Sequence, residues 1–99
     1  MKFGLNKAVL EKLRTLFSAS PKIKRVVIFG SRAMGTQKNG SDIDLALLGE
    51  GLQSRDVRRL YGAMDKFYFP YKFDIVILKD VKEPALVEHI ERVGKTIYP

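Results

Sequence analysis

The spacing of apolar residues along the chain separates helical segments from extended ones. Between residues 6 and 17, apolar side chains recur every three or four positions, which predicts an amphipathic helix capped by Asn6. Residues 23–29, 42–48 and 73–78 are instead short apolar runs rich in β-branched and aromatic side chains, which predicts three strands. Both faces of the run at 23–29 are apolar, so we expect either helices on both sides of the sheet or a partner resting on one exposed face.

Serine, proline and glycine mark the remaining helices. Ser31 can cap a short helical turn over residues 32–34, and Ser54 can cap a second long helix. Pro84 begins a last helix and Gly94 ends it. The order of helix, strand, short helix, strand, helix, strand and helix predicts an α/β (α+β) fold, in which a small sheet of about three strands is flanked by helices.

Length and composition favour one ordinary globular domain. The chain has 99 residues, of which 45% are hydrophobic and 29% are charged, and no stretch is polar or glycine-rich enough to be a linker. We therefore expect residues 1–99 to form a single domain with one modest core. The absence of cysteine, and of any apolar run typical of a signal peptide or a membrane span, predicts a soluble cytoplasmic protein.

The charge of the chain narrows its partners only in part. A formal net charge of +7 attracts nucleotides, nucleic acid or an acidic protein surface, although many basic domains are simply kept soluble by their lysines. Arg55, Arg58 and Arg59 share a predicted helix, where they form either a solvated face or a surface for a partner or RNA. His89 is the single histidine, which excludes a zinc cluster built from histidines, and we assign it no role.

Two aspartates begin an otherwise apolar strand. Asp42 and Asp44 are two positions apart, so in a strand their side chains project from the same face about 6–7 Å apart. Asp74 joins them if the third strand lies beside the second. Carboxylates within about 5 Å repel by about 3 kcal/mol per pair at an effective dielectric constant near 20, so a cation or a proton must relieve them. Mg²⁺ fits, because it takes oxygen ligands and keeps positions for substrate phosphates.

The turn after the first strand offers a place for those phosphates. Gly30 lets a phosphate approach the backbone, the Ser31 hydroxyl and nearby amides can donate hydrogen bonds, and Arg32 can add a charged donor. A Gly-Ser turn alone is a weak signal. Its spacing of ten residues before Asp-x-Asp makes the combination far more specific.

Together these motifs resemble a known family. The segments VVIFGSRAMGTQKNGSDIDLALL and FDIVIL are similar to the minimal nucleotidyltransferases of the DNA polymerase beta superfamily, which include antitoxins that operate beside a HEPN-domain toxin. The resemblance implies a palm-like nucleotidyltransferase fold with a small mixed sheet. It also implies that Gly30 and Ser31 bind the nucleotide, that Asp42 and Asp44 are the metal-binding pair, and that Asp74 is the third catalytic carboxylate.

The chemistry that the resemblance implies is nucleotidyl transfer with two Mg²⁺ ions. Asp42 and Asp44 would hold both ions, and Asp74 would complete the site of the ion that activates the acceptor hydroxyl. We expect an NMP, AMP from ATP in the first instance, to be moved to a hydroxyl group. In the family the acceptor can be a tyrosine of the partner toxin, so a HEPN-type partner in a hetero-oligomer is expected.

Two other functions remain open at this point. A non-catalytic module could neutralise a HEPN partner by covering it, through an apolar sheet face or the arginine-bearing helix. Binding of nucleic acid through charge alone would survive the loss of all three aspartates and would weaken steeply with salt.

Overall fold

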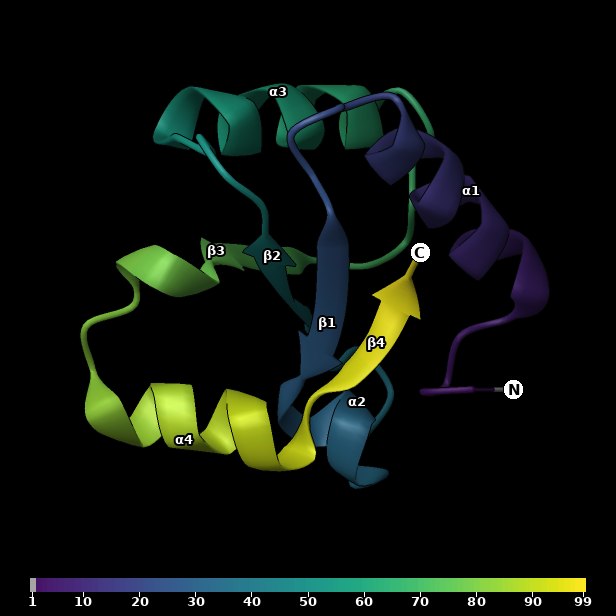
Figure 1. The fold of residues 1–99 in the computed structure, drawn as a ribbon. Helices are drawn as coiled ribbons and strands as arrows, with labels where there is room; N and C mark the ends of the chain where they lie inside the picture. The colour runs from purple at the N-terminus through teal and green to yellow at the C-terminus, as the bar shows by residue number, and fades with distance from the viewer. Residues whose placement is uncertain (1) are drawn as a thin grey trace.

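Four strands form one mixed sheet in the computed structural model, which describes residues 2–99 (Figure 1). The strand order is β3-β2-β1-β4, where β1 is antiparallel to both of its neighbours and β2 is parallel to β3. In chain order the elements are α1 (Lys7–Ser18), β1 (Arg25–Phe29), α2 (Gly30–Met34), β2 (Ile43–Leu48), α3 (Ser54–Asp65), β3 (Phe73–Ile77), the 3-10 helix η1 (Leu78–Asp80), α4 (Pro84–Val93) and β4 (Lys95–Tyr98).

The expected α/β sheet flanked by helices is confirmed, but its fourth strand was not predicted. The strand β4 follows α4 after the single residue Gly94, and it pairs with β1 through Val27 opposite Thr96. Four residues form a stable strand only when an existing edge accepts their hydrogen bonds. The run Thr-Ile-Tyr at 96–98 was the available signal for it, and its partner lies some 70 positions earlier in the sequence.

Helices cover both faces of the sheet, which is the first of the two arrangements expected from the apolar faces of β1. Val26 and Ile28 face the larger core, where they pack with buried residues of α1 and α3. Val27 and Phe29 face the opposite way, toward Ile90 of α4 (Figure 1). The second face is covered by one helix, which leaves room there for polar side chains.

The helix starts follow the predicted chemistry only in part. Asn6 caps α1, since its Oδ1 accepts a hydrogen bond from the Val9 amide at 2.9 Å. Ser54 does not cap α3: the cap is Gln53, which exchanges hydrogen bonds with Asp56 in a capping box. Ser31 does not cap α2 either, because the helix begins one residue earlier, at Gly30, and Ser31 is its second residue.

Gly94 ends α4 as predicted, although not through a left-handed turn. Its φ of −59° is accessible to any residue, but an added Cβ would overlap the Ile90 carbonyl oxygen and a methyl group of Val27. Glycine is needed there because the end of α4 lies directly against β1.

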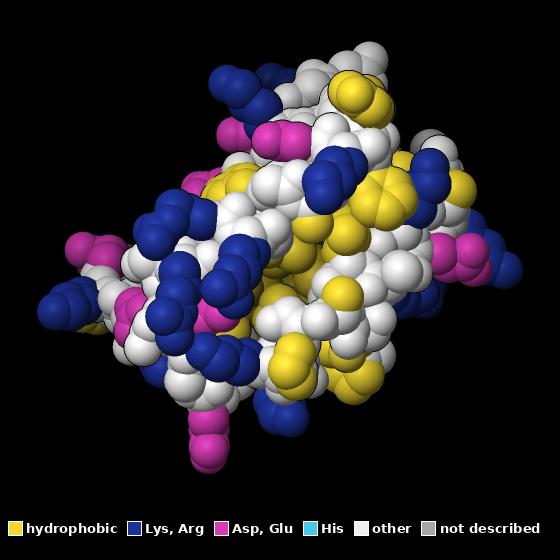
Figure 2. All heavy atoms as spheres, turned by 90° about the horizontal axis from the view of Figure 1, so that it is seen from above, with side chains coloured by type: hydrophobic (Ala, Val, Ile, Leu, Met, Phe, Trp, Pro, Cys, Tyr) yellow, Lys and Arg dark blue, Asp and Glu magenta, His cyan; other side chains and the backbone are white. Residues whose placement is uncertain are grey.

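The arginines of α3 face outward. Arg55, Arg58 and Arg59 are exposed, and lysine and arginine side chains gather beside an apolar hollow on this face of the molecule (Figure 2). None of the helices within residues 2–99 is both long and apolar enough to cross a bilayer.

Candidate active site

Strand register brings two of the predicted carboxylates side by side. The parallel pairing of β2 with β3 sets Asp44 opposite Asp74. Both side chains leave the sheet on the face that α4 covers in part, because Ala46 and Val76, two positions further along each strand, pack there. Asp42 lies just before β2 and is exposed. It is two positions before Asp44, so an extended chain directs both side chains to the same face. The strand therefore begins at Ile43, one residue later than predicted. The three carboxylates nevertheless lie in one region of the sheet.

The Gly30 turn lies directly against Asp44. Phe29, the last residue of β1, pairs with Asp44, so the chain turns into α2 beside that carboxylate. Gly30 has a φ of +72°, and a Cβ on it would overlap Oδ2 of Asp44. Glycine therefore serves twice here, by adopting a left-handed conformation and by leaving space for the carboxylate. Ser31 follows and is partly exposed.

The electrostatics of Asp44 show that the carboxylates act on one another. Partial burial raises the pKa of Asp44, and the charges of Asp74 and Asp42 raise it further, while His89 and Arg32 lower it by smaller amounts. Raising the pKa of a carboxylate means that its charged form is disfavoured unless a cation joins it. The sequence-based prediction of mutual repulsion among these three residues agrees with this shift.

The donor set fits a hard divalent cation, although the side chains do not yet converge on it. Within residues 2–99 no three acidic or histidine side chains point to a common centre as they would in a preformed metal site. The three carboxylates nevertheless supply the oxygen ligands that Mg²⁺ prefers, and Mg²⁺ takes only one or two protein carboxylates and keeps the rest of its shell for water and phosphate. Asp44, whose charge is crowded by two neighbours, is where a cation would relieve most repulsion.

Arg32 is buried, which sequence reasoning did not anticipate. Only 4% of it is exposed, and its guanidinium donates to the carbonyl oxygens of Phe3 at 2.8 Å and of Ser41 at 2.9 Å. The guanidinium also stacks over the ring of Tyr71 at 5.1 Å. Arg32 thereby fixes the residue before Asp42 and lowers the charge crowding at Asp44. Its role as a phosphate ligand stays a prediction.

His89 is the residue of this region that the sequence did not reveal. Its Nε2 accepts a hydrogen bond from the Gly30 amide at 3.1 Å, and its ring meets the Phe29 ring edge to face with centroids 6.1 Å apart. One face of α4 therefore holds the Gly30 turn in place. No local pattern marks this histidine, because 59 positions separate it from Gly30.

A family model matches most of the chain. The model of the polymerase beta nucleotidyltransferase domain matches residues 11–99. The chain belongs to this nucleotidyltransferase family. The match runs from within α1 to the end of the chain, so it includes Gly30, all three aspartates and the unpredicted strand β4.

Solved structures extend the comparison. A toxin–antitoxin complex with AMP-PNP contains a chain that is 29% identical, with a TM-score of 0.72, and the match covers 94% of this chain and 73% of that one. A protein described as a candidate minimal nucleotidyltransferase is 28% identical, with a TM-score of 0.71 and coverages of 96% and 95%.

A more distant match concerns a modified complex. In the complex of a tri-AMPylated HEPN toxin from Shewanella oneidensis with its MNT antitoxin, the matching chain is 22% identical, with a TM-score of 0.63 and coverages of 94% and 71%. At that identity the likeness shows the shared fold. Among curated proteins, none matches this nucleotidyltransferase.

Proposed function

We propose that this nucleotidyltransferase moves AMP from ATP, with Mg²⁺, to a hydroxyl group on a HEPN-type partner protein. The observation that carries the proposal is the register that sets Asp44 beside Asp74, with Asp42 and the Gly30 turn at the same end of the sheet. Further support comes from neighbours of the same fold, one solved with AMP-PNP and another in complex with a tri-AMPylated HEPN toxin. In this proposal residues 1–99 act as one cytoplasmic domain and the partner supplies the acceptor.

Each residue of the site has a definite task in the transfer. Asp42, Asp44 and Asp74 would hold the divalent cations. When bound, Mg²⁺ supplies positive charge that offsets the charge developing on the phosphate oxygens. Asp74 lies on the outer strand β3 and is exposed, so an acceptor could reach it and Asp74 could take the proton of the attacking hydroxyl.

The Gly30 turn would bind the other end of the nucleotide. Its left-handed backbone brings the chain close to Asp44, and the amides at the start of α2 can donate to the triphosphate. His89 would act as a positioning residue, since its Nε2 accepts the hydrogen bond of the Gly30 amide and so holds the turn in place. Pyrophosphate leaves as the acceptor oxygen bonds to the α-phosphorus.

Transfer of label from α-³²P-ATP to a purified HEPN-domain protein encoded beside this chain tests the proposal. Asp44→Asn keeps the shape of the side chain but removes its charge, so we expect loss of transfer by at least about a thousandfold. Asp65→Asn, an exposed position at the end of α3, is the matched control and should transfer normally. Full transfer by both Asp42→Asn and Asp44→Asn would refute the proposal, and tight complex formation without any adduct would favour the non-catalytic module instead.

A further inference from the structure

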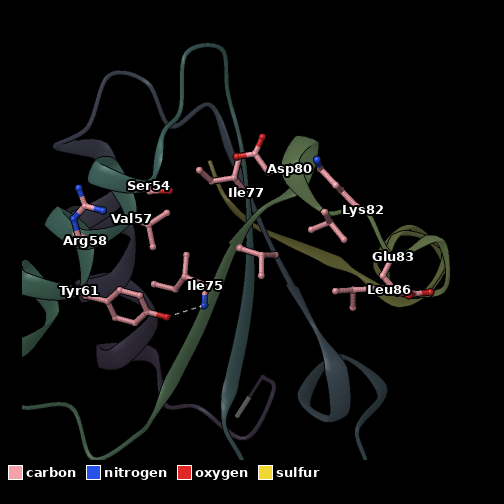
Figure 3. A pocket seen from close by; sticks show the side chains of 12 residues that line it. Ser54, Val57, Arg58, Tyr61, Ile75, Ile77, Asp80, Lys82, Glu83 and Leu86 are labelled. Carbon is pink, nitrogen blue, oxygen red and sulfur yellow. Dashed lines mark hydrogen bonds between the residues drawn. The ribbon is translucent and has the colours of Figure 1, made fainter.

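The outer edge of β3 forms the floor of an open groove. The groove has a volume of about 530 Å³ and runs between α3 and the segment from η1 to α4 (Figure 3). Val57 and Tyr61 line its α3 wall, and Leu86 lines its α4 wall. Because β3 is the last strand of the sheet on this side, the groove follows an unpaired strand edge.

Part of that edge is already satisfied by a side chain. The Tyr61 hydroxyl donates to the Phe73 carbonyl oxygen at 3.1 Å and accepts from the Ile75 amide at 2.9 Å, the second of which Figure 3 shows. A neighbouring strand would make the same pairing. On the inner side of β3, the Lys72 carbonyl accepts from Ile43 of β2. Alternation along a strand therefore directs the Ile75 carbonyl and the Ile77 amide into the groove, next to the Tyr61 hydroxyl.

The groove therefore offers the features that an extended peptide requires. A donor and an acceptor of the backbone lie on its floor, and apolar side chains stand on both walls for the alternate residues of an added strand. Its rim carries both signs of charge, from Arg58 and Lys82 on one hand and from Asp80 and Glu83 on the other. A mixed rim does not attract a polyanion, so these features favour a protein segment over nucleic acid.

The groove also approaches the proposed active site along β3. Val76 lines the groove, and Asp74 lies two positions before it on the same face of β3, about 7 Å away along the strand. Tyr61 reaches the edge from the α3 side and occupies the pairing position between Phe73 and Ile75. A segment that pairs with Ile77 must therefore leave the strand edge where it reaches Tyr61. Because Tyr61 blocks the α3 side, the segment leaves toward the face of β3 that carries Asp74.

We infer that the groove seats an extended segment of the partner protein by strand addition to β3 and delivers the acceptor hydroxyl to Asp74. The inference rests on the proposed function, and it names the surface that recognises the acceptor. Pairing with the Ile75 carbonyl and the Ile77 amide sets the register of the segment. The residue that passes Tyr61 then lies beside Asp74, where its hydroxyl loses a proton and its oxygen attacks the α-phosphorus.

Amide hydrogen exchange with and without the purified HEPN-domain protein tests the strand addition directly. The Ile77 amide should exchange at least about tenfold more slowly in the complex, because it gains a hydrogen bond. The Ile75 amide is bonded to Tyr61 in the free chain and should change little, and Gly40 in an exposed loop should not change at all. Unchanged exchange at Ile77 in a formed complex, or slowing that depends only on the concentration of this chain, would overturn the inference.

A variant of the groove wall separates this inference from the proposed function. Leu86→Arg places charge on the apolar α4 wall and should reduce AMP transfer to the partner by at least about tenfold while ATP binding stays within about twofold. Glu91→Arg, an exposed position on the same helix, is the matched control. Normal transfer by Leu86→Arg would refute the role of the groove but would not contradict the proposed nucleotidyl transfer. Absence of any adduct with the unaltered chain would instead refute the proposed function. Slower exchange of the Ile77 amide in the complex would then show whether the groove still binds the partner.

Discussion

Asp44 and Asp56 are both aspartates with restricted access to solvent, yet their surroundings shift their pKa values in opposite directions. Asp56 accepts a hydrogen bond from the Gln53 amide at 2.8 Å, which is the main reason that its pKa is lowered. The Nζ atom of Lys22 lies 3.7 Å from Oδ2 of Asp56. Asp44 is partly buried beside Asp74 and Asp42, and its pKa is raised.

The difference separates a carboxylate whose partners lie within the fold from one that is crowded by like charges. The charge of Asp56 is matched by a helix start, a lysine and nearby arginines, so this residue has its partners within the fold. The charge of Asp44 is crowded by like charges and is only partly offset by His89 and Arg32. A fold tolerates such crowding where a cation brought with the substrate relieves it, which is why a perturbed pKa points to a functional site.

Among variants that keep all three aspartates, the largest effect is expected from Gly30→Ala, which changes the surroundings of Asp44. The new Cβ would displace the Asp44 carboxylate, so AMP transfer should fall by about a hundredfold or more. Gly35→Ala is the matched control, because Gly35 has a φ of +76° but nothing within 4 Å of an added Cβ. Both variants should lose about 1–2 kcal/mol of stability from the left-handed backbone. Equal transfer rates in the two variants would contradict the role of the Gly30–Asp44 contact.

A smaller effect is expected from His89→Ala. Loss of the acceptor for the Gly30 amide should raise KM for ATP about fivefold, the equivalent of about 1 kcal/mol for one hydrogen bond, with kcat changed less. His89→Gln can offer an amide oxygen in place of Nε2 and should recover part of the affinity. Steady-state kinetics of the three proteins would show this split, and an equal loss of kcat in both variants would argue that the histidine only supports packing.

The smallest effects are changes in thermal stability that have opposite signs at the two aspartates. At pH 7 without divalent cations, Asp44→Asn should raise Tm by a few degrees, because a raised native pKa means that the ionised form destabilises the fold. Asp56→Asn should lower Tm, because a lowered native pKa means that the ionised form stabilises it.

The dependence on pH sharpens that pair of expectations. The penalty at Asp44 disappears as pH falls through its raised native pKa toward 3.8, so the Tm gain of Asp44→Asn should shrink there. The contribution of Asp56 is present above pH 3.8 and is lost only as pH falls through its lowered native pKa. Melting curves followed by circular dichroism between pH 3 and pH 7 would measure both, and Tm shifts of the same sign at pH 7 would contradict the comparison.

Local patterns in the sequence were enough for most of the secondary structure and for the motif of the site. Alternating and helical spacing predicted three strands and the long helices, and Asn6 was correctly expected to cap α1. The Gly-Ser turn and the Asp-x-Asp pair could be recognised because each depends on neighbouring positions. Ser31 and Ser54 were wrongly expected to cap helices. The cap of α2 is Phe29, two positions before Ser31, and the cap of α3 is Gln53, one position before Ser54.

Only the tertiary structure decided which distant residues meet. The register of β2 with β3 set Asp74 beside Asp44, the packing of α4 brought His89 to Gly30, and the edge of β1 made a strand of residues 95–98. Arg32 became buried for the same reason, since its carbonyl partners come from the start of the chain and the loop before Asp42. Residue spacing is a local property, whereas these contacts depend on how the helices and strands pack, because burial of apolar faces selects one arrangement of the whole chain.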